Sequence, residues 1–310
     1  MLWGAVIVAA GVGARFGRNK QLAELAGKPV VAWSIEAFAA MPEISDIVIV
    51  TEPELVDSMH AVARPLVRST ALTVVRGGAD RQASACNGVH AVPAHCAGIL
   101  IHDGARPLVR PPEVRAAMRA VKPGTASLLA QRVVDTIKVA DVDGKVVRTL
   151  DRDGLWAAQT PQLATARDLV RAHDEAVRHQ WPRATDDAAL LERAGLDVVV
   201  VPGSAENFKV TLPDDLARAA GILAAREPFV DEEEVLLVEC FVPARAVDDV
   251  LAELETRAAR VDAVERDLPA AVAIRAHASN TALRGFGIRL HALAGEDALF
   301  TTHLTPSIAS

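Results

Sequence analysis

Cysteine is scarce in this sequence, which contains only Cys86, Cys96 and Cys240. The three residues are widely spaced and form no C-x-x-C pair, so neither a disulfide framework nor a zinc cage is expected. The nine histidines likewise show no paired spacing typical of metal ligands. We therefore expect the cysteines to be small buried side chains in a protein of the reducing cytoplasm.

The sequence also has no long apolar run, and its acidic residues outnumber its basic ones. The N-terminal run Leu2–Val8 is too short to span a bilayer and has no cationic leader, so it predicts a buried first strand and no membrane role. The net charge of −7 and a pI near 5.7 argue against nucleic-acid binding through a basic face, although a local cationic pocket remains compatible with them. Only six of the 33 cationic residues are lysines, and Lys20 and Lys209 stand in polar, motif-like segments.

The length of 310 residues, with 51% hydrophobic residues, predicts two domains. Short β-branched runs alternate with helical stretches up to about residue 225, which indicates a Rossmann-like α/β domain with a mostly parallel sheet covered on both faces. In chain order the expected elements are strand 5–8, helix 30–41, strand 47–51, helix 53–63, strand 72–75, helix 81–92, strand 98–101 and helix 112–120. We place this domain at residues 1–225.

Two segments depart from that alternation. Residues 136–152 carry short strands on either side of the turn signal Asp141–Gly144, which predicts an inserted β-hairpin arm. A two-stranded hairpin is marginal alone, so a second subunit is one candidate to pack against it. A proline and an acidic run at 226–234 mark the domain boundary. Beyond it, strands 235–242, 260–267, 271–276 and 297–304 with helices 244–259 and 280–293 give the βαββαβ order of a ferredoxin-like α+β domain at 234–310.

A glycine-rich loop follows the first strand. Its glycines, Gly11, Gly13 and Gly17, allow close backbone approach, and its cations, Arg15, Arg18 and Lys20, would stand beside exposed N–H groups. The spacing fits neither the G-x-G-x-x-G dinucleotide motif nor a P-loop. The loop therefore predicts a polyphosphate site of another kind, with a tight turn bearing incidental surface arginines as the alternative.

Further polar clusters follow later strands and complete an ordered set. The turn Gly77-Gly78 and the pair His102-Asp103 both follow predicted strands, which should bring them to one edge of the sheet with the glycine-rich loop. The set comprises Ala9-Ala10-Gly11-x-Gly13-x-Arg15-Phe16, Lys20-Gln21, Gly77-Gly78 with Arg81 and Ser84, His102-Asp103-Gly104-Ala105-Arg106-Pro107, Val134-Asp135-Thr136-Ile137-Lys138, Asp151-Arg152-x-Gly154-Leu155-Trp156 with Thr160-Pro161-Gln162, Thr185-Asp186-Asp187-Ala188 and Asn207-x-Lys209-Val210-Thr211.

In this order the clusters resemble the 2-C-methyl-D-erythritol 4-phosphate cytidylyltransferase family over residues 5–223. The resemblance implies transfer of CMP from CTP to methylerythritol phosphate with release of pyrophosphate. It assigns catalysis to Arg15, Lys20, Arg152 and Lys209, nucleotide binding to Ala9, Ala10, Gly11, Gly13, Gly78, Ser84 and Asp103, and substrate binding to Arg106, Thr136, Thr185 and Asp186. Glu206 is a weaker candidate for the substrate region.

The resemblance also implies that Asp103 binds Mg²⁺ or the ribose. A single aspartate suffices for Mg²⁺, because magnesium takes few protein carboxylates and relies on phosphate oxygens and water. It implies a homodimer through the 136–152 hairpin, with Arg152 reaching into the neighbouring subunit's site. A ribitol-5-phosphate cytidylyltransferase would share the nucleotide half, and a non-catalytic nucleotide sensor that binds a partner is the alternative of another class.

Simpler roles exist for several of these residues. Asp103 could cap the following helix, Thr185 could cap a helix over 186–194, and Asp151 with Arg152 could form a surface ion pair. Ser84 could be an ordinary helix residue and Glu206 a solvated loop carboxylate.

Two features depart from the family pattern. Only four residues separate Arg15 from Lys20, with Asn19 where proline is usual, so Arg18 could share the role of Lys20. Residues 226–310 are additional to the usual enzyme. Their strand order and the Gly285-Phe286-Gly287 segment resemble the C-terminal ferredoxin-like domain of elongation factor G, which implies a docking, oligomerising or regulatory role.

Overall fold

The structure is a computed structural model of the chain. It describes residues 1–11, 20–67, 70–226, 235–266, 271–279, 282–283, 286–295 and 298–304. The chain divides into two compact units, Met1–Ala225 and Arg226–Ser310. Most of the expected boundary segment, residues 227–234, lies outside the described residues.

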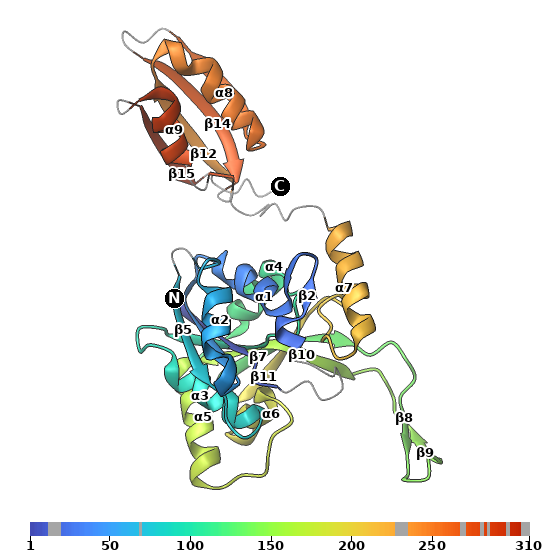
Figure 1. Cartoon of the computed structure of the whole chain (residues 1–310). Coiled ribbons are helices and arrows are strands. Elements are labelled where there is room, and N and C mark those ends of the chain that lie inside the picture. Colours follow the sequence, from blue (N-terminus) through green and yellow to red (C-terminus); the bar gives the residue numbers. More distant parts are fainter. Residues whose placement is uncertain are drawn as a thin grey trace. The chain divides into compact units, whose positions relative to one another are not determined.

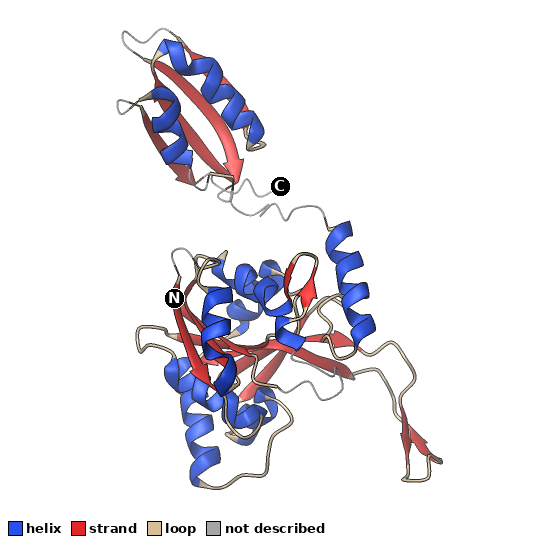
Figure 2. Ribbon diagram, viewed as in Figure 1, coloured by secondary structure: helices blue, strands red, loops and turns tan. Residues whose placement is uncertain are grey.

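A seven-stranded sheet forms the centre of the first unit, with the order β11-β7-β10-β6-β1-β4-β5 (Figures 1 and 2). Neighbours are parallel except β10, which runs antiparallel to both β6 and β7. The strands are β1 (Trp3–Val8), β4 (Ile44–Thr51), β5 (Ala71–Arg76), β6 (Gly98–Asp103), β7 (Thr125–Arg132), β10 (Trp156–Thr165) and β11 (Asp197–Pro202). The predicted α/β class with a mostly parallel sheet is confirmed.

Helices cover both faces of this sheet (Figure 2). In β1, Ala5 and Ile7 pack into one core cluster with α1, α2 and α4, whereas Val6 and Val8 pack into another with α3, α5 and α6. Because both faces are buried, the strand is a continuous apolar run. The helices are α1 (Val30–Ala39), α2 (Val56–Ala63), α3 (Arg81–Ala91), α4 (Pro111–Ala120), α5 (Ala166–Arg178) and α6 (Asp187–Arg193).

The first unit also contains four short elements and one longer helix. They are η1 (Lys20–Leu22), β2 (Glu24–Leu25), β3 (Lys28–Pro29), η2 (Pro53–Leu55) and the helix α7 (Pro213–Ala225). Leu25, Leu108, Val210 and Ala219 form a small buried cluster that holds α7 and the segment before it against β2. This packing fixes the backbone next to Lys209.

Several predicted boundaries in the first unit were wrong, among them those of one helix and one strand. The helix expected over 53–63 begins with the 3₁₀ turn η2, and α2 starts only at Val56. His102 and Asp103 do not follow β6 but are its last two residues, because they continue the parallel pairing with Ile7 and Val8 of β1.

The predicted hairpin arm is present as β8 (Lys138–Ala140) and β9 (Val146–Thr149), which among the described strands pair only with each other. The arm projects from the strands β7 and β10 (Figure 1). Asp141 Oδ1 accepts hydrogen bonds from the N–H groups of Asp143 and Lys145, and Gly144 has φ +80°, which glycine adopts without strain.

The second unit has the predicted βαββαβ order, with the antiparallel sheet β13-β14-β12-β15 (Figure 1). Its core combines Val238 and Cys240 of β12 with Val250 of α8 and Phe286 of α9. The elements are β12 (Val235–Val242), η3 (Ala244–Ala246), α8 (Val247–Thr256), β13 (Arg260–Glu265), β14 (Val272–Ser279), α9 (Phe286–Ala294) and β15 (Leu299–Leu304).

The predicted helix 244–259 is thus a 3₁₀ turn followed by the shorter α8, and α9 starts at Phe286, six residues after the predicted start of that helix. Gly285, part of the segment similar to elongation factor G, lies outside the described residues, so that resemblance stays a prediction. Among the described helices of both units, none has the length and apolar character needed to cross a bilayer.

Candidate active site

A cavity of about 530 Å³ opens where β1, β5 and β6 end. Carboxyl ends of parallel strands meet at one edge of a sheet, which is where ligands of such folds bind. Residues predicted from the sequence line this cavity, namely Ala10, Gly11, Lys20, Gly78, Ser84, Asp103 and Lys209. Ala9 is buried just before them and its N–H donates to the carbonyl of Val50.

The Gly77-Gly78 turn forms one wall of the cavity. A Cβ on Gly77 would lie 2.4 Å from Ala10 Cβ, and one on Gly78 would lie 2.5 Å from Ala83 Cβ, so neither position accommodates a side chain. Ser84 lies in the first turn of α3, where its Oγ accepts from the Gly78 N–H at 3.0 Å and donates to the Asp80 carbonyl at 2.8 Å. The hydroxyl predicted to read the base therefore also closes this turn.

Asp103 is the centre of the cationic part of the site. Lys209 Nζ lies 2.8 Å from Oδ2, Arg81 Nε lies 3.1 Å from Oδ1, and Arg106 Nε lies 3.9 Å from Oδ2. Burial alone raises the pKa of Asp103, but these three cations outweigh it and hold the pKa well below its ordinary value. One ionised carboxylate thus fixes the positions of three cationic side chains.

Part of the cavity wall is acidic. Glu52 and Glu54, from the segment between β4 and α2, also line the cavity. Positive charge is therefore concentrated around Asp103 and Lys20 rather than spread over the whole surface.

His102 lies behind Asp103 and is fully buried. Thr160 Oγ1 accepts from the Asp103 N–H at 3.0 Å and donates to His102 Nδ1 at 3.1 Å, and His102 Nε2 donates to the Arg106 carbonyl at 3.1 Å. Burial lowers the pKa of His102 to about 4, so the ring is neutral near pH 7. The histidine is a buried hydrogen-bonded group that holds the end of β6 in place.

The segment 207–210 is tied to the loop after β6. The buried Asn207 donates through Nδ2 to the Thr160 carbonyl at 2.8 Å, and its own carbonyl accepts from Arg106 Nη1 at 2.7 Å. The Val210 N–H donates to the Ala105 carbonyl at 2.8 Å, and the Val210 carbonyl accepts from Lys20 Nζ at 3.1 Å. These bonds bring Lys20 and Lys209 to the same cavity from sequence positions 189 residues apart.

Other predicted site residues lie elsewhere or outside the described residues. Gly13 and Arg15 fall in the segment 12–19, which the structure does not describe. Thr136 stands at the base of the hairpin arm, and Arg152, which is exposed, donates to the Val134 carbonyl there. Neither of these two residues lines the cavity within this chain.

The structure also shows which helix caps and ion pairs several of these residues form. Asp186, not Thr185, caps α6, because its Oδ1 accepts from the Ala189 N–H at 2.9 Å while Oδ2 accepts from Gln162 Nε2 at 2.9 Å. Asp103 caps no helix, since α4 begins eight residues later. In the described chain Arg152 forms no ion pair with Asp151, and Glu206 pairs with Arg110 at 2.7 Å.

The first unit is similar to known proteins. Residues 4–225 match the IspD family, described as 2-C-methyl-D-erythritol 4-phosphate cytidylyltransferase. The chain belongs to this family. A relative of that name from Trichormus variabilis is 42% identical over 224 residues, covering 72% of this chain and 98% of the relative. One from Pelotomaculum thermopropionicum is 40% identical over 227 residues, covering 72% and 94%.

Solved structures agree with the family assignment. The 4-diphosphocytidyl-2C-methyl-D-erythritol synthase of Anaerococcus prevotii has a TM-score of 0.63 at 26% identity and covers 72% of this chain and 98% of that one. The 2-C-methyl-D-erythritol 4-phosphate cytidylyltransferase of Thermus thermophilus has a TM-score of 0.59 at 27% identity, with 71% and 98% covered. The predicted nucleotidyltransferase class is confirmed, and the family match ends where the first unit ends.

Within this cytidylyltransferase domain, sequence reasoning assigned no specific role to Arg81 and Asp187. Arg81 Nη2 lies 2.9 Å from Asp187 Oδ2, so the guanidinium joins the buried Asp187 of α6 to Asp103 of β6. The two carboxylates raise the pKa of Arg81 further above its ordinary value, although burial opposes them. The motif position of Arg81 near Gly77-Gly78 is the sequence feature that could have indicated a role in the site. Its two carboxylate partners could not be predicted, because they depend on where the fold places α3 and α6.

Asp103 is also the residue in the cavity best suited to hold a metal ion. Its carboxylate is ionised and both oxygens lie against cationic side chains, whose place a divalent cation could take. Asp80, another carboxylate of the wall, is engaged in capping α3 and in an ion pair with Arg183 at 2.8 Å.

Proposed function

We propose that this chain transfers CMP from CTP to 2-C-methyl-D-erythritol 4-phosphate. A phosphate oxygen of the acceptor attacks the α-phosphorus of CTP, a new P–O bond forms, and the bond to the bridging oxygen breaks. Pyrophosphate leaves with that electron pair. Such a reaction needs positioning and charge stabilisation rather than covalent help from a side chain.

The observation that carries the proposal is the convergence of Lys20, Lys209 and Arg81 on one cavity at the end of β1. A fixed cation is most effective where negative charge develops in a site shielded from water. Lys20 would stabilise the triphosphate together with Arg15 of the glycine-rich loop. Lys209 and Arg106 would orient the phosphate of the acceptor.

The pyrimidine would lie against the Gly11 and Gly78 side of the cavity, where these two glycines carry no side chain and Ser84, 2% exposed, also lines the wall. Backbone N–H and carbonyl groups there can read a base edge at close range. Thr185 and Asp186 are the residues we propose for the polyol region, and Asp186 also caps α6.

Mg²⁺ is the metal we propose, with Asp103 as its protein ligand. Magnesium prefers oxygen ligands and keeps several waters, so a single carboxylate beside the phosphates is a sufficient protein contribution. When bound, it would neutralise charge on the phosphate oxygens. Asp103 would hold the ion through its carboxylate, and Lys209, whose Nζ lies 2.8 Å from Asp103 Oδ2, would bind the phosphate of the acceptor.

A homodimer through the hairpin arm completes the proposal. The arm carries exposed apolar side chains, with Val142 101%, Val147 64% and Val146 53% exposed, and β8 and β9 have no other strand partner among the described residues. A second copy could bury these valines. Arg152 and Thr136 lie away from this chain's cavity, so they would act in the site of the partner subunit.

The main experiment measures pyrophosphate release with each of four nucleoside triphosphates and with methylerythritol or ribitol phosphate as acceptor. We expect turnover only with CTP and methylerythritol phosphate. Lys209→Ala should lower kcat by about a hundredfold or more. The matched control is Lys122→Ala, an exposed lysine outside the cavity, which should leave kcat unchanged. Preference for ribitol phosphate, or an unchanged rate in Lys209→Ala, would contradict the proposal.

The role of Arg152 in the partner's site has a separate test. Arg152→Ala and Lys20→Ala proteins, each inactive alone, should regain activity when mixed, because some mixed dimers hold one intact site. A failure to recover activity although labelled subunits exchange would show that Arg152 does not act in trans.

A further inference from the structure

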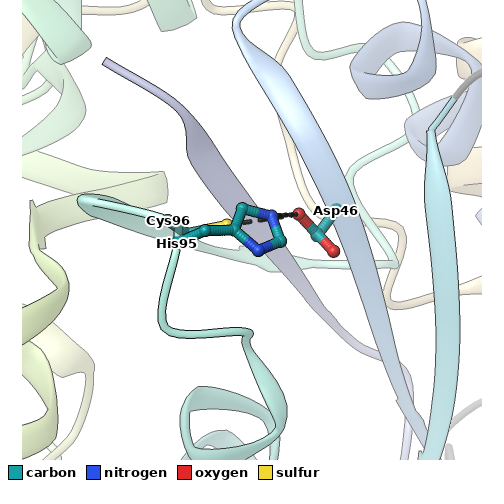
Figure 3. Close-up of side chains that lie close together, drawn as sticks. All are labelled: Asp46, His95 and Cys96. Carbon is teal, nitrogen blue, oxygen red and sulfur yellow. Dashed lines mark hydrogen bonds and ion pairs between the residues drawn. The ribbon is translucent and has the colours of Figure 1, made fainter.

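A second cluster of polar side chains lies near the ends at which β4 and β6 begin, whereas the cavity lies where the parallel strands end. Asp46 is the third residue of β4, and His95 with Cys96 stands just before β6. Figure 3 shows the imidazole of His95 and the thiol of Cys96 both directed at the carboxylate of Asp46. No sequence pattern indicated this site, because His95 and Cys96 stand 49 and 50 residues after Asp46.

The geometry brings three different metal-binding groups together. His95 Nε2 lies 2.6 Å and Cys96 Sγ lies 3.3 Å from Asp46 Oδ2, and the three donor atoms all lie within 4.8 Å of one another. Ser45 Oγ lies beside them, 2.6 Å from Asp46 Oδ2 and 3.4 Å from Cys96 Sγ. One nitrogen, one sulfur and one oxygen donor at this separation match the ligand types that Zn²⁺ accepts.

The cluster also contains a buried carboxylate without a permanent cation. Asp46 is 5% exposed, and among the described residues no lysine or arginine pairs with it. Its Oδ2 accepts hydrogen bonds from Ser45 Oγ at 2.6 Å and from Cys96 Sγ at 3.3 Å. A buried ionised carboxylate is favoured by a nearby positive charge, which a metal ion would supply.

We propose that Asp46, His95 and Cys96 form a binding site for a divalent transition-metal ion of the zinc class. The metal binds His95 Nε2, Asp46 Oδ2 and the Cys96 thiolate, the thiol proton passes to solvent, and water fills the fourth position of a tetrahedron. The ion enters from the surface, since the His95 side chain is 55% exposed while Asp46 and Cys96 are buried behind it.

This site is separate from the proposed reaction. Asp46 pairs with Gly4 of β1, four residues before Val8 at the cavity, which is about 13 Å along the strand. Mg²⁺ prefers oxygen ligands and does not compete for a thiolate and an imidazole. The ion would therefore join the loop before β6 to β4 and stabilise the fold without entering the transfer step.

The test is a titration of the full-length apoprotein with Co²⁺, which reports thiolate ligation through a charge-transfer absorption band. We expect one Co²⁺ per chain with this band, displacement by Zn²⁺, and a rise in the unfolding temperature. Cys96→Ser should abolish the band and His95→Ala should weaken binding by about tenfold or more. His95→Ala is a surface change, so it keeps the test valid if Cys96→Ser folds poorly.

Cys86→Ser is the matched control. Cys86 also lies near a histidine, with Sγ 3.6 Å from His90 Nδ1, but the carboxylate of Asp174 binds the other ring nitrogen, so one ion cannot reach all three groups. The band should survive in Cys86→Ser, and pyrophosphate release should be unchanged in Cys96→Ser. No band at equimolar Co²⁺, or a band lost only in Cys86→Ser, would overturn the proposal.

Discussion

Replacing Arg81 with methionine should destabilise the first unit, because this guanidinium is the link between two buried carboxylates. Asp187 is 2% exposed and loses its ion pair with Arg81, whereas Asp103 keeps Lys209 and Arg106. His173 lies 3.9 Å from Asp187, but burial lowers the pKa of His173, so the ring supplies no positive charge near pH 7. Asp187 is therefore left without a compensating charge.

The expected cost is about 3 kcal/mol, the lower end of the range for removing one partner of a buried ion pair, since Asp103 keeps two of its cations. For a unit of this size that lowers the unfolding temperature by roughly 6–12 °C. Tryptophan fluorescence is the suitable assay, because all four tryptophans, Trp3, Trp33, Trp156 and Trp181, belong to the first unit.

Two further variants make this prediction specific. Adding Asp187→Asn to Arg81→Met should recover much of the lost stability, since the uncompensated charge is gone. Arg183→Met removes an exposed ion pair, with Arg183 76% exposed, and should cost at most about 1 kcal/mol. An Arg81→Met protein as stable as wild type, or no recovery in the double variant, would refute the electrostatic account of Arg81.

Three more predictions concern the metal ligand, the buried histidine and the hairpin arm. Asp103→Asn should raise the Mg²⁺ concentration that gives half-maximal pyrophosphate release by about tenfold or more, and an unchanged value would remove Asp103 as the ligand. The pKa of His102 is lowered to about 4 in the folded protein, so the unfolded chain binds the proton at a higher pH than the folded chain does. The free energy of unfolding of the wild type should therefore fall by roughly 3 kcal/mol as the pH falls from 6.5 to 4. Urea titrations should show that this free energy depends less on pH in His102→Asn. Val147→Asp should convert a dimer to monomer in sedimentation, while Val177→Asp, similarly exposed on α5, should leave the dimer intact.

Much of the fold follows from hydrophobic periodicity. The run Trp3–Val8 is apolar at every position because Ala5 and Ile7 face one helical layer while Val6 and Val8 face the other. Helix and strand ends were less predictable. Pro53 opens a 3₁₀ turn rather than α2, and tertiary pairing with β1 extends β6 through Asp103.

The candidate site could be predicted where a residue stands directly after a strand or beside a glycine. Gly11 and Gly78 line the cavity for that reason, whereas Lys209 reaches it from the segment between β11 and α7. The ion pair between Arg81 and Asp187 could not be predicted, because it depends on how the fold places the start of α3 near the start of α6. Thr185 and Asp186 are both good capping residues, so the sequence could not decide between them; only the backbone of α6 does.

The most direct test of the central claim compares the binding of CTP and of cytidine to wild type and to Lys20→Ala by titration calorimetry. If cations gathered at the end of β1 hold the triphosphate, Lys20→Ala should weaken CTP binding by about tenfold to a hundredfold and leave cytidine binding unchanged. Equal weakening of both ligands, or no weakening of CTP, would contradict the account.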